Sequence, residues 1–192
     1  AMWLALGLPH AAFAALHLRR LYRQGALTER LGLRRGDFTI GLLLGALIFA
    51  AAAAARHVGL GQDARGLAWL FRLSLQLGLD APGPQLLAGL AALGALEELT
   101  WRGLVLDALE PAVGSRRAFA VTALLYAGAH LPTAWTLGDP AVGANPLLVL
   151  AAAGAGLPWS FAASMLGRLT PVVISHAAFS YFAVAWLIPR VG

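Results

Sequence analysis

The stretch LLAGLAALGALEELTWRGLVL, residues 86–106, is the most informative part of this chain for its fold, because it contains charged side chains inside an apolar run. Glu97, Glu98 and Arg102 stand in it with apolar residues on both sides. A charged side chain at membrane depth costs about 2.5–3.5 kcal/mol on insertion scales. Charges this close together need partners, so the stretch predicts a buried polar centre on a membrane helix.

The composition extends this prediction to the whole chain. Of the 192 residues, 59% are hydrophobic and only 12% are charged. A soluble domain averages about half apolar residues and a quarter charged ones. Apolar segments recur along the full length, which predicts an all-α, polytopic transmembrane bundle that forms a single integral membrane domain over residues 1–192.

Six or seven membrane spans are expected, with no sheet. Gly41 and Gly45 have the spacing of residues that let two helices approach closely, and Pro84 is suited to open the helix that carries the charged motif. Residues 67–79 are short for a span and either lie in the interface or form a tilted span. The other spans are expected at residues 3–18, 38–55, about 85–109, 116 to about 133, 147–166 and 172–188.

The charges indicate topology and exclude some functions. The net charge of +5 comes from arginine alone, and there is no cysteine, which excludes disulfides and thiolate chemistry. The arginines flank apolar segments instead of forming a basic stripe, so we expect no nucleic-acid partner. If residues 67–79 lie in the interface, Arg116, Arg117 and Arg168 fall on the cytoplasmic side together with the arginine-rich residues 19–37. The positive-inside rule favours this arrangement.

Helix geometry divides the charged motif into two parts. Glu98 and Arg102 are four residues apart and can pair along one face. Glu97 is rotated by about 100° and points elsewhere, with Trp101 four residues on as part of an apolar wall. An unpaired buried carboxylate suits a general base. The alternative is a polar network that only holds helices together.

Two later apolar segments carry further pairs at the same spacing. Tyr126 and His130 share one face of their helix, and His176 and Ser180 share one face of the last span. The second pair can donate hydrogen bonds in one direction, as an oxyanion site requires. Alone, each histidine is typical of helix packing, but the pairs together indicate an active site.

Other assignments are weaker on the sequence. A set of one glutamate and two histidines also suits zinc, but no two of these ligands share a helix turn, so we expect no metal and no cofactor. Ser180 as a nucleophile would lack a group to orient its base. Several remaining polar side chains are expected at the interface or in solvent: His10, His17, His57, Asp107 and Glu110.

The three motifs, in this order, resemble the CPBP family, which comprises CAAX prenyl proteases and bacteriocin-processing proteins and is also called the Abi family. The resemblance rests on residues 97–102, on Tyr126 to His130, and on His176 to Ser180 with its lead-in RLTPVVIS. It covers roughly residues 85–182 and implies a protease-like core at about 85–190.

The resemblance implies an intramembrane endopeptidase of the glutamate type. Glu97 matches the family's general base, and His130 matches the histidine that helps to activate water. His176 matches the oxyanion-stabilising histidine, and Ser180 stands where the family often has asparagine. The supporting residues implied by the family are Glu98, Arg102 and Tyr126, the last in place of a common phenylalanine.

We therefore expect hydrolysis of a membrane-anchored protein or peptide in the lipid bilayer. The composition is typical of a bacterium with a GC-rich genome, so the bacterial inner membrane is the expected location. Removal of a C-terminal sorting signal, as in the myxosortase-like branch of the family, is one candidate role, and bacteriocin processing or self-immunity is another. The alternatives are a non-enzymatic scaffold or immunity protein, a zinc-dependent protease, and a proton-coupled transporter.

Overall fold

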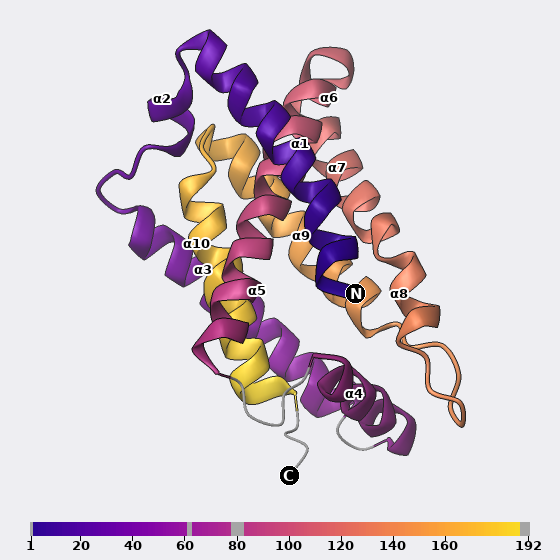
Figure 1. The fold of residues 1–192 in the computed structure, drawn as a ribbon. Helices are drawn as coiled ribbons and strands as arrows, with labels where there is room; N and C mark the ends of the chain where they lie inside the picture. Colours follow the sequence, from indigo (N-terminus) through magenta and orange to yellow (C-terminus); the bar gives the residue numbers. More distant parts are fainter. Residues whose placement is uncertain (1, 61–62, 78–82, 189–192) are drawn as a thin grey trace.

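The computed structural model describes residues 2–60, 63–77 and 83–188, and its regular elements are helices (Figure 1). Within these residues, strand-like pairing is limited to one isolated bridge between Asp139 and Gly143. The predicted all-α class is confirmed. The elements are α1 (Met2–Gln24), α2 (Leu27–Leu31), α3 (Asp37–Ala55), η1 (Arg56–Leu60), α4 (Ala64–Leu77), α5 (Pro84–Glu98), η2 (Leu99–Val105), α6 (Leu106–Val113), α7 (Ser115–Ala129), α8 (Leu131–Thr136), α9 (Leu147–Leu166), α10 (Thr170–Phe182) and η3 (Ala183–Leu187).

Helices α3 and α10 pack tightly because glycines lie at their contact. A Cβ atom on Gly41 would lie 2.7 Å from Ile174 and from the Pro171 carbonyl oxygen, and one on Gly45 would lie 3.0 Å from the Ser175 carbonyl oxygen. The close approach predicted from the glycine spacing is confirmed. It fixes α10, and with it His176, against the rest of the bundle.

The helix that carries the charged motif is longer than predicted. Elements α5, η2 and α6 follow one another without a break from Pro84 to Val113. Pro84 opens the helix as expected, but Pro111 lies inside α6, and the turn comes only at Gly114, which has a positive φ of 79°. The central segment η2 is π-helical, a rare geometry that is frequent at functional sites.

The predicted span over residues 116 to about 133 is divided in two. Helix α7 ends at Ala129 and the short helix α8 starts at Leu131, with Pro132 at its beginning. Proline has no backbone N–H to donate within a helix, so it starts a new helix more readily than it continues an old one. His130 therefore lies at a helix boundary.

Among the residues that the structure describes, three helices are long and apolar enough to cross a membrane: Asp37–Leu60, Leu147–Leu166 and Thr170–Leu187. On the first of these, large apolar side chains such as Leu43 and Leu47 are 67% exposed, as is expected of a surface that faces lipid. Of the six or seven membrane spans that were expected, the described helices therefore support three. Residues 78–79 of the segment predicted at 67–79 lie outside the described residues, and the remainder belongs to α4.

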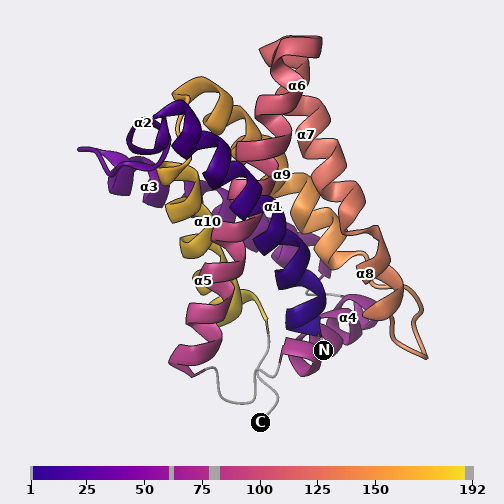
Figure 2. The ribbon, with the colours of Figure 1, turned by 45° about the horizontal axis from the view of Figure 1, so that its top comes forward.

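The bundle has two distinct ends (Figures 1 and 2). The α1–α2 connection, the α6–α7 junction and the α9–α10 turn lie at one end, whereas α4, the end of α10 and the α8–α9 loop lie at the other. Asn145, in that loop, donates to the Trp69 carbonyl oxygen at 3.0 Å and so attaches α4 to it.

Candidate active site

The first component of the site is the buried pair formed by Glu98 and Arg102. Arg102 Nη1 donates to Glu98 Oε1 at 3.1 Å, and both side chains are 0% exposed. The predicted pairing along one helix face is confirmed. His176 Nδ1 also lies 2.8 Å from the same Glu98 oxygen, so this carboxylate links α5 to α10.

Helix α9 supplies partners for Arg102 that the sequence did not indicate. Arg102 Nε donates to Ser160 Oγ at 3.1 Å, and Nη2 donates to the Gly156 carbonyl oxygen at 3.0 Å. The guanidinium carbon lies 4.3 Å from the centre of the Tyr126 ring, a cation–π distance. The sequence offers only a weak signal for these contacts, because Gly154 and Gly156 suit α9 to close packing but do not indicate which helix it meets.

Glu97 lies beside this pair but has different contacts. It is 8% exposed, and its Oε2 accepts a hydrogen bond from the Tyr126 hydroxyl at 2.8 Å. His176 Nε2 is 4.0 Å from the same oxygen. Within the described part of the chain, no arginine is paired with Glu97, but this carboxylate is not isolated, because a tyrosine from α7 fixes one of its oxygens.

His176 is held on three sides. Its ring stacks on Trp159 with 4.1 Å between ring centres and 19° between the planes. Trp159 is in turn anchored by a hydrogen bond from its Nε1 to Ser175 Oγ at 2.9 Å. A Cβ on Gly94 would lie 3.2 Å from the His176 ring. Together with the Glu98 contact, these neighbours fix the imidazole so that Nε2 faces Glu97.

His130 is fixed by its own helix. Its Nδ1 lies 2.9 Å from the Tyr126 carbonyl oxygen. A carbonyl oxygen only accepts hydrogen bonds, so Nδ1 carries the proton and Nε2 of the neutral ring is left to accept one. The two rings meet edge to face with 4.7 Å between their centres. The shared face predicted for this pair is confirmed.

One cavity of about 230 Å³ brings the predicted residues together. Its lining is mainly apolar, and Trp101 forms part of it, as predicted. The predicted site residues that line this cavity are Glu97, Tyr126, His130, His176 and Ser180. Glu98 and Arg102 lie behind them, where they support the lining without forming it.

Helix α1 contributes to the site, contrary to the prediction that His10 and His17 are interfacial. His10 lines the cavity, and Trp101 Nε1 donates to its Nε2 at 3.3 Å. His17 is completely buried, and a Cβ on Gly103 would lie 2.6 Å from its Nε2. The sequence could not indicate these contacts because they join α1 to η2, which lies far along the chain.

Two acidic residues expected to be solvated are also engaged. Asp107 forms an ion pair with Arg30 at 2.5 Å, and Glu110 accepts a hydrogen bond from Ser164 at 3.2 Å. Both lie on α6, near the end of the bundle that is rich in arginine. They stabilise the connections there and lie outside the cavity.

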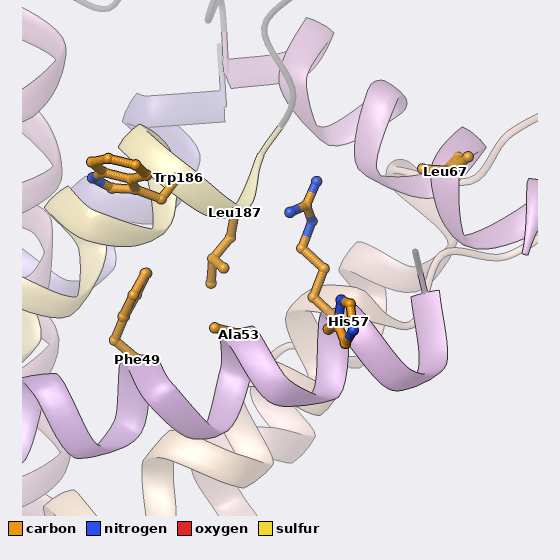
Figure 3. A pocket seen from close by; sticks show the side chains of 7 residues that line it. Phe49, Ala53, His57, Leu67, Trp186 and Leu187 are labelled. Atoms are coloured by element: carbon orange, nitrogen blue, oxygen red, sulfur yellow. The ribbon is translucent and has the colours of Figure 1, made fainter. Parts of the chain in front are cut away.

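A second cavity of about 490 Å³ lies where α3, α4 and η3 meet (Figure 3). Phe49 and Ala53 of α3 line one side, and Trp186 and Leu187 of η3 line the other. None of the predicted catalytic residues lines this second cavity, so the cavity beside Glu97 is the candidate site.

Among the described residues, no group of three or more acidic or histidine side chains is arranged to hold a metal ion. One candidate ligand atom in each of two residues is already hydrogen-bonded to the protein. Glu97 Oε2 accepts from Tyr126, and His176 Nδ1 is engaged by Glu98.

Comparison with known families gives one match. The family model described as type II CAAX prenyl endopeptidase Rce1-like matches residues 79–182, more than half of the chain. The matched region includes every predicted site residue, whereas α1 to α4 lie before it. No curated protein and no solved structure matches the chain.

Proposed function

Because the chain belongs to the type II CAAX prenyl endopeptidase Rce1-like family, we propose that it is an intramembrane endopeptidase in which Glu97 activates water. Family membership and the apolar helices make the protein an integral membrane peptidase. The proposal of a glutamate mechanism rests on the difference between two adjacent carboxylates. Glu98 is bound to Arg102 and His176, whereas Glu97 lies at the cavity with only a tyrosine hydroxyl and a distant imidazole beside it.

In the proposed reaction, Glu97 takes a proton from a water molecule in the cavity. The water oxygen attacks the carbonyl carbon of the substrate peptide, and the electron pair of the C=O bond moves to the oxygen. Collapse of this tetrahedral species breaks the C–N bond, and the proton passes to the leaving amine. His130 lines the same cavity with Nε2 free to accept a proton, so it assists the transfer.

We assign stabilisation of the oxyanion to His176 and Ser180. With Nδ1 directed at Glu98, His176 can donate from Nε2 only when its ring is doubly protonated. The carboxylates of Glu98 and Glu97, at 2.8 and 4.0 Å, are placed to balance the charge of that imidazolium. Ser180 lies one helical turn further along α10 and adds a hydroxyl donor to the same cavity.

The proposed substrate is a membrane-anchored protein or peptide in the lipid bilayer, with no nucleic acid, cofactor or metal involved. The removal of a C-terminal sorting signal and the processing of a bacteriocin are the candidate roles. We also propose six membrane crossings: α1, α3 with η1, α5 to α6, α7 with α8, α9, and α10 with η3. Helix α4 then lies in the interface.

The test compares a bacterial host that expresses the wild-type chain with one that expresses Glu97→Gln at equal level. Mass spectrometry of newly formed peptide termini in the membrane fraction detects cleavage of any membrane protein, whatever the identity of the substrate. We expect termini that appear with the wild-type protein and are absent with Glu97→Gln. Identical termini in the two hosts would favour the scaffold or transporter alternatives over a protease.

A further inference from the structure

The active-site cavity and the arginine-rich surface lie toward opposite ends of the bundle, and this separation bears on the kind of substrate that can reach the cavity. The chain has fourteen positively charged residues, all arginine. Seven of them are in or next to the α1–α2, α6–α7 and α9–α10 connections at one end: Arg19, Arg20, Arg23, Arg30, Arg116, Arg117 and Arg168. Arg34 and Arg35 lie in the α2–α3 connection, which Arg168 joins to the same end through the Gly32 carbonyl oxygen. Short loops rich in arginine stay in the cytoplasm, so this is the cytoplasmic end.

Hydrogen bonds close the cytoplasmic end. Arg30 Nη1 donates to the Gly167 carbonyl oxygen at 2.8 Å, and Leu169 N donates to the Arg30 carbonyl oxygen at 3.0 Å. Arg168 donates to Asp37 at 2.5 Å and to the Gly32 carbonyl oxygen at 2.8 Å. The segment that contains α2 is thus fastened across the α9–α10 turn.

The cavity extends in the other direction. Beyond Glu97 and His176, its lining continues to Val184 and Ile188 near the end of the last helix, and to Gln76 on α4. No described residue from the arginine-rich connections belongs to the lining. The Asn145–Trp69 hydrogen bond holds α4 beside this opening, at the end where α3 and η3 also terminate (Figures 1 and 3).

Because the cavity extends away from the arginine-rich end, we infer that it opens on the non-cytoplasmic side of the membrane. We infer further that the substrate is an exported, membrane-anchored protein. Its cleavable segment would already have crossed the membrane, and it would present apolar residues to the apolar lining of the cavity. A prenylated cytosolic protein presents its C-terminus on the opposite side and is therefore excluded as a substrate. The substrate class rests on the proposed function, whereas the orientation can be measured without any proteolysis.

The absence of native cysteine allows a direct test by single-cysteine labelling. Ser115→Cys places an exposed thiol at the arginine-rich end, and Ala141→Cys places one in the exposed loop at the other end. Both residues are small, exposed and outside the site, so they are matched controls for each other. Gln76→Cys adds an exposed thiol at the cavity opening.

Each variant is expressed in a bacterial host, and spheroplasts are treated with a membrane-impermeant maleimide before and after permeabilisation. We expect Ala141→Cys and Gln76→Cys to be labelled in intact spheroplasts, and Ser115→Cys to be labelled only after permeabilisation. Labelling of Ser115→Cys in intact spheroplasts, alone or together with Ala141→Cys, would overturn the inference, because the chain would then be inverted or inserted in both orientations.

The same variants in the Glu97→Gln background separate this inference from the proposed function. The labelling pattern should not change, because orientation does not depend on catalysis. The expected pattern without any Glu97-dependent cleavage would refute the protease and leave the orientation standing. The inverted pattern with Glu97-dependent cleavage would refute the orientation and leave the protease standing.

Discussion

At the scale of single residues, the adjacent carboxylates Glu97 and Glu98 have different environments and should respond differently to the same change. Glu97→Gln keeps the shape of the side chain and still accepts from Tyr126, so the protein should fold and be extracted in normal yield. Without a carboxylate to take the proton from water, cleavage should be abolished. Wild-type turnover by purified Glu97→Gln would refute the assignment of the general base.

The matched change Glu98→Gln should lower both yield and activity. Glu98 is fully buried between Arg102 and His176, and removal of one charge from a buried pair typically costs about 3–5 kcal/mol. Thermal unfolding in detergent should therefore separate the two variants, with a lower Tm for Glu98→Gln than for Glu97→Gln. Equal melting temperatures would contradict the supporting role of Glu98.

His176 and Ser180 should differ in importance at the oxyanion position. Loss of one oxyanion donor typically lowers kcat by about 10²–10³-fold. His176→Ala should be nearly inactive, because it also removes the partner of Glu98 and Trp159. Ser180→Ala should be impaired by less, since a hydroxyl is a weaker and more mobile donor, and Ser180→Asn should remain active.

A serine-directed phosphonate provides the opposing test. If Ser180 acts only as a hydrogen-bond donor, the reagent should leave the protein unmodified by intact mass and leave its activity unchanged. A covalent adduct on Ser180 would make that side chain a nucleophile, and the water mechanism with Glu97 as base would have to be abandoned.

At the scale of helices, α9 should prove as important to the site as the helices that carry the charged motifs. A Cβ on Gly156 would lie 2.9 Å from the Tyr126 ring and 3.3 Å from Arg102 Nη2. Gly156→Ala should therefore displace two supports of the glutamates and lower both kcat and Tm. Gly154→Ala, on the same helix, has no heavy atom within 4 Å of its new Cβ and is the matched control.

The control variant Gly154→Ala should lose neither activity nor thermal stability. Alanine is favoured over glycine in a helix interior by roughly 0.5–1 kcal/mol, so Gly154→Ala should keep full activity and unfold at the same or a slightly higher temperature. Equal behaviour of the two alanine variants would show that Gly156 does not set the distance between α9 and the buried arginine.

At the scale of the whole molecule, the site is assembled from α5, α7 and α10, and we predict that it works without metal. One carboxylate oxygen of Glu97 and one ring nitrogen of His176 are already hydrogen-bonded to protein groups. Purified protein should contain no stoichiometric zinc by elemental analysis and should keep its activity in a chelator. Activity that is lost to a chelator and restored by Zn²⁺ would favour the zinc-dependent protease instead.

The sequence was sufficient to predict the helical class and the pairing of side chains within one helix. Helix periodicity is local, so the pairing of Glu98 with Arg102 and the shared face of Tyr126 and His130 followed from four-residue spacing, and both are confirmed. Composition likewise predicted an all-α, apolar bundle, which the helices confirm. Glycine spacing predicted the close contact of α3, which depends only on the missing side chain.

The tertiary structure was needed to show which of these helix faces meet and which side chains support them. The contact of His176 with Glu98 joins residues 78 positions apart, and Arg102 reaches Gly156 across 54. No local sequence pattern predicts a contact between residues so far apart in the chain, because such a contact depends on how whole helices pack. For the same reason, the burial of His17 depends on the packing of α1 against η2, and the end at which the cavity opens depends on the position of α4 beside the α8–α9 loop.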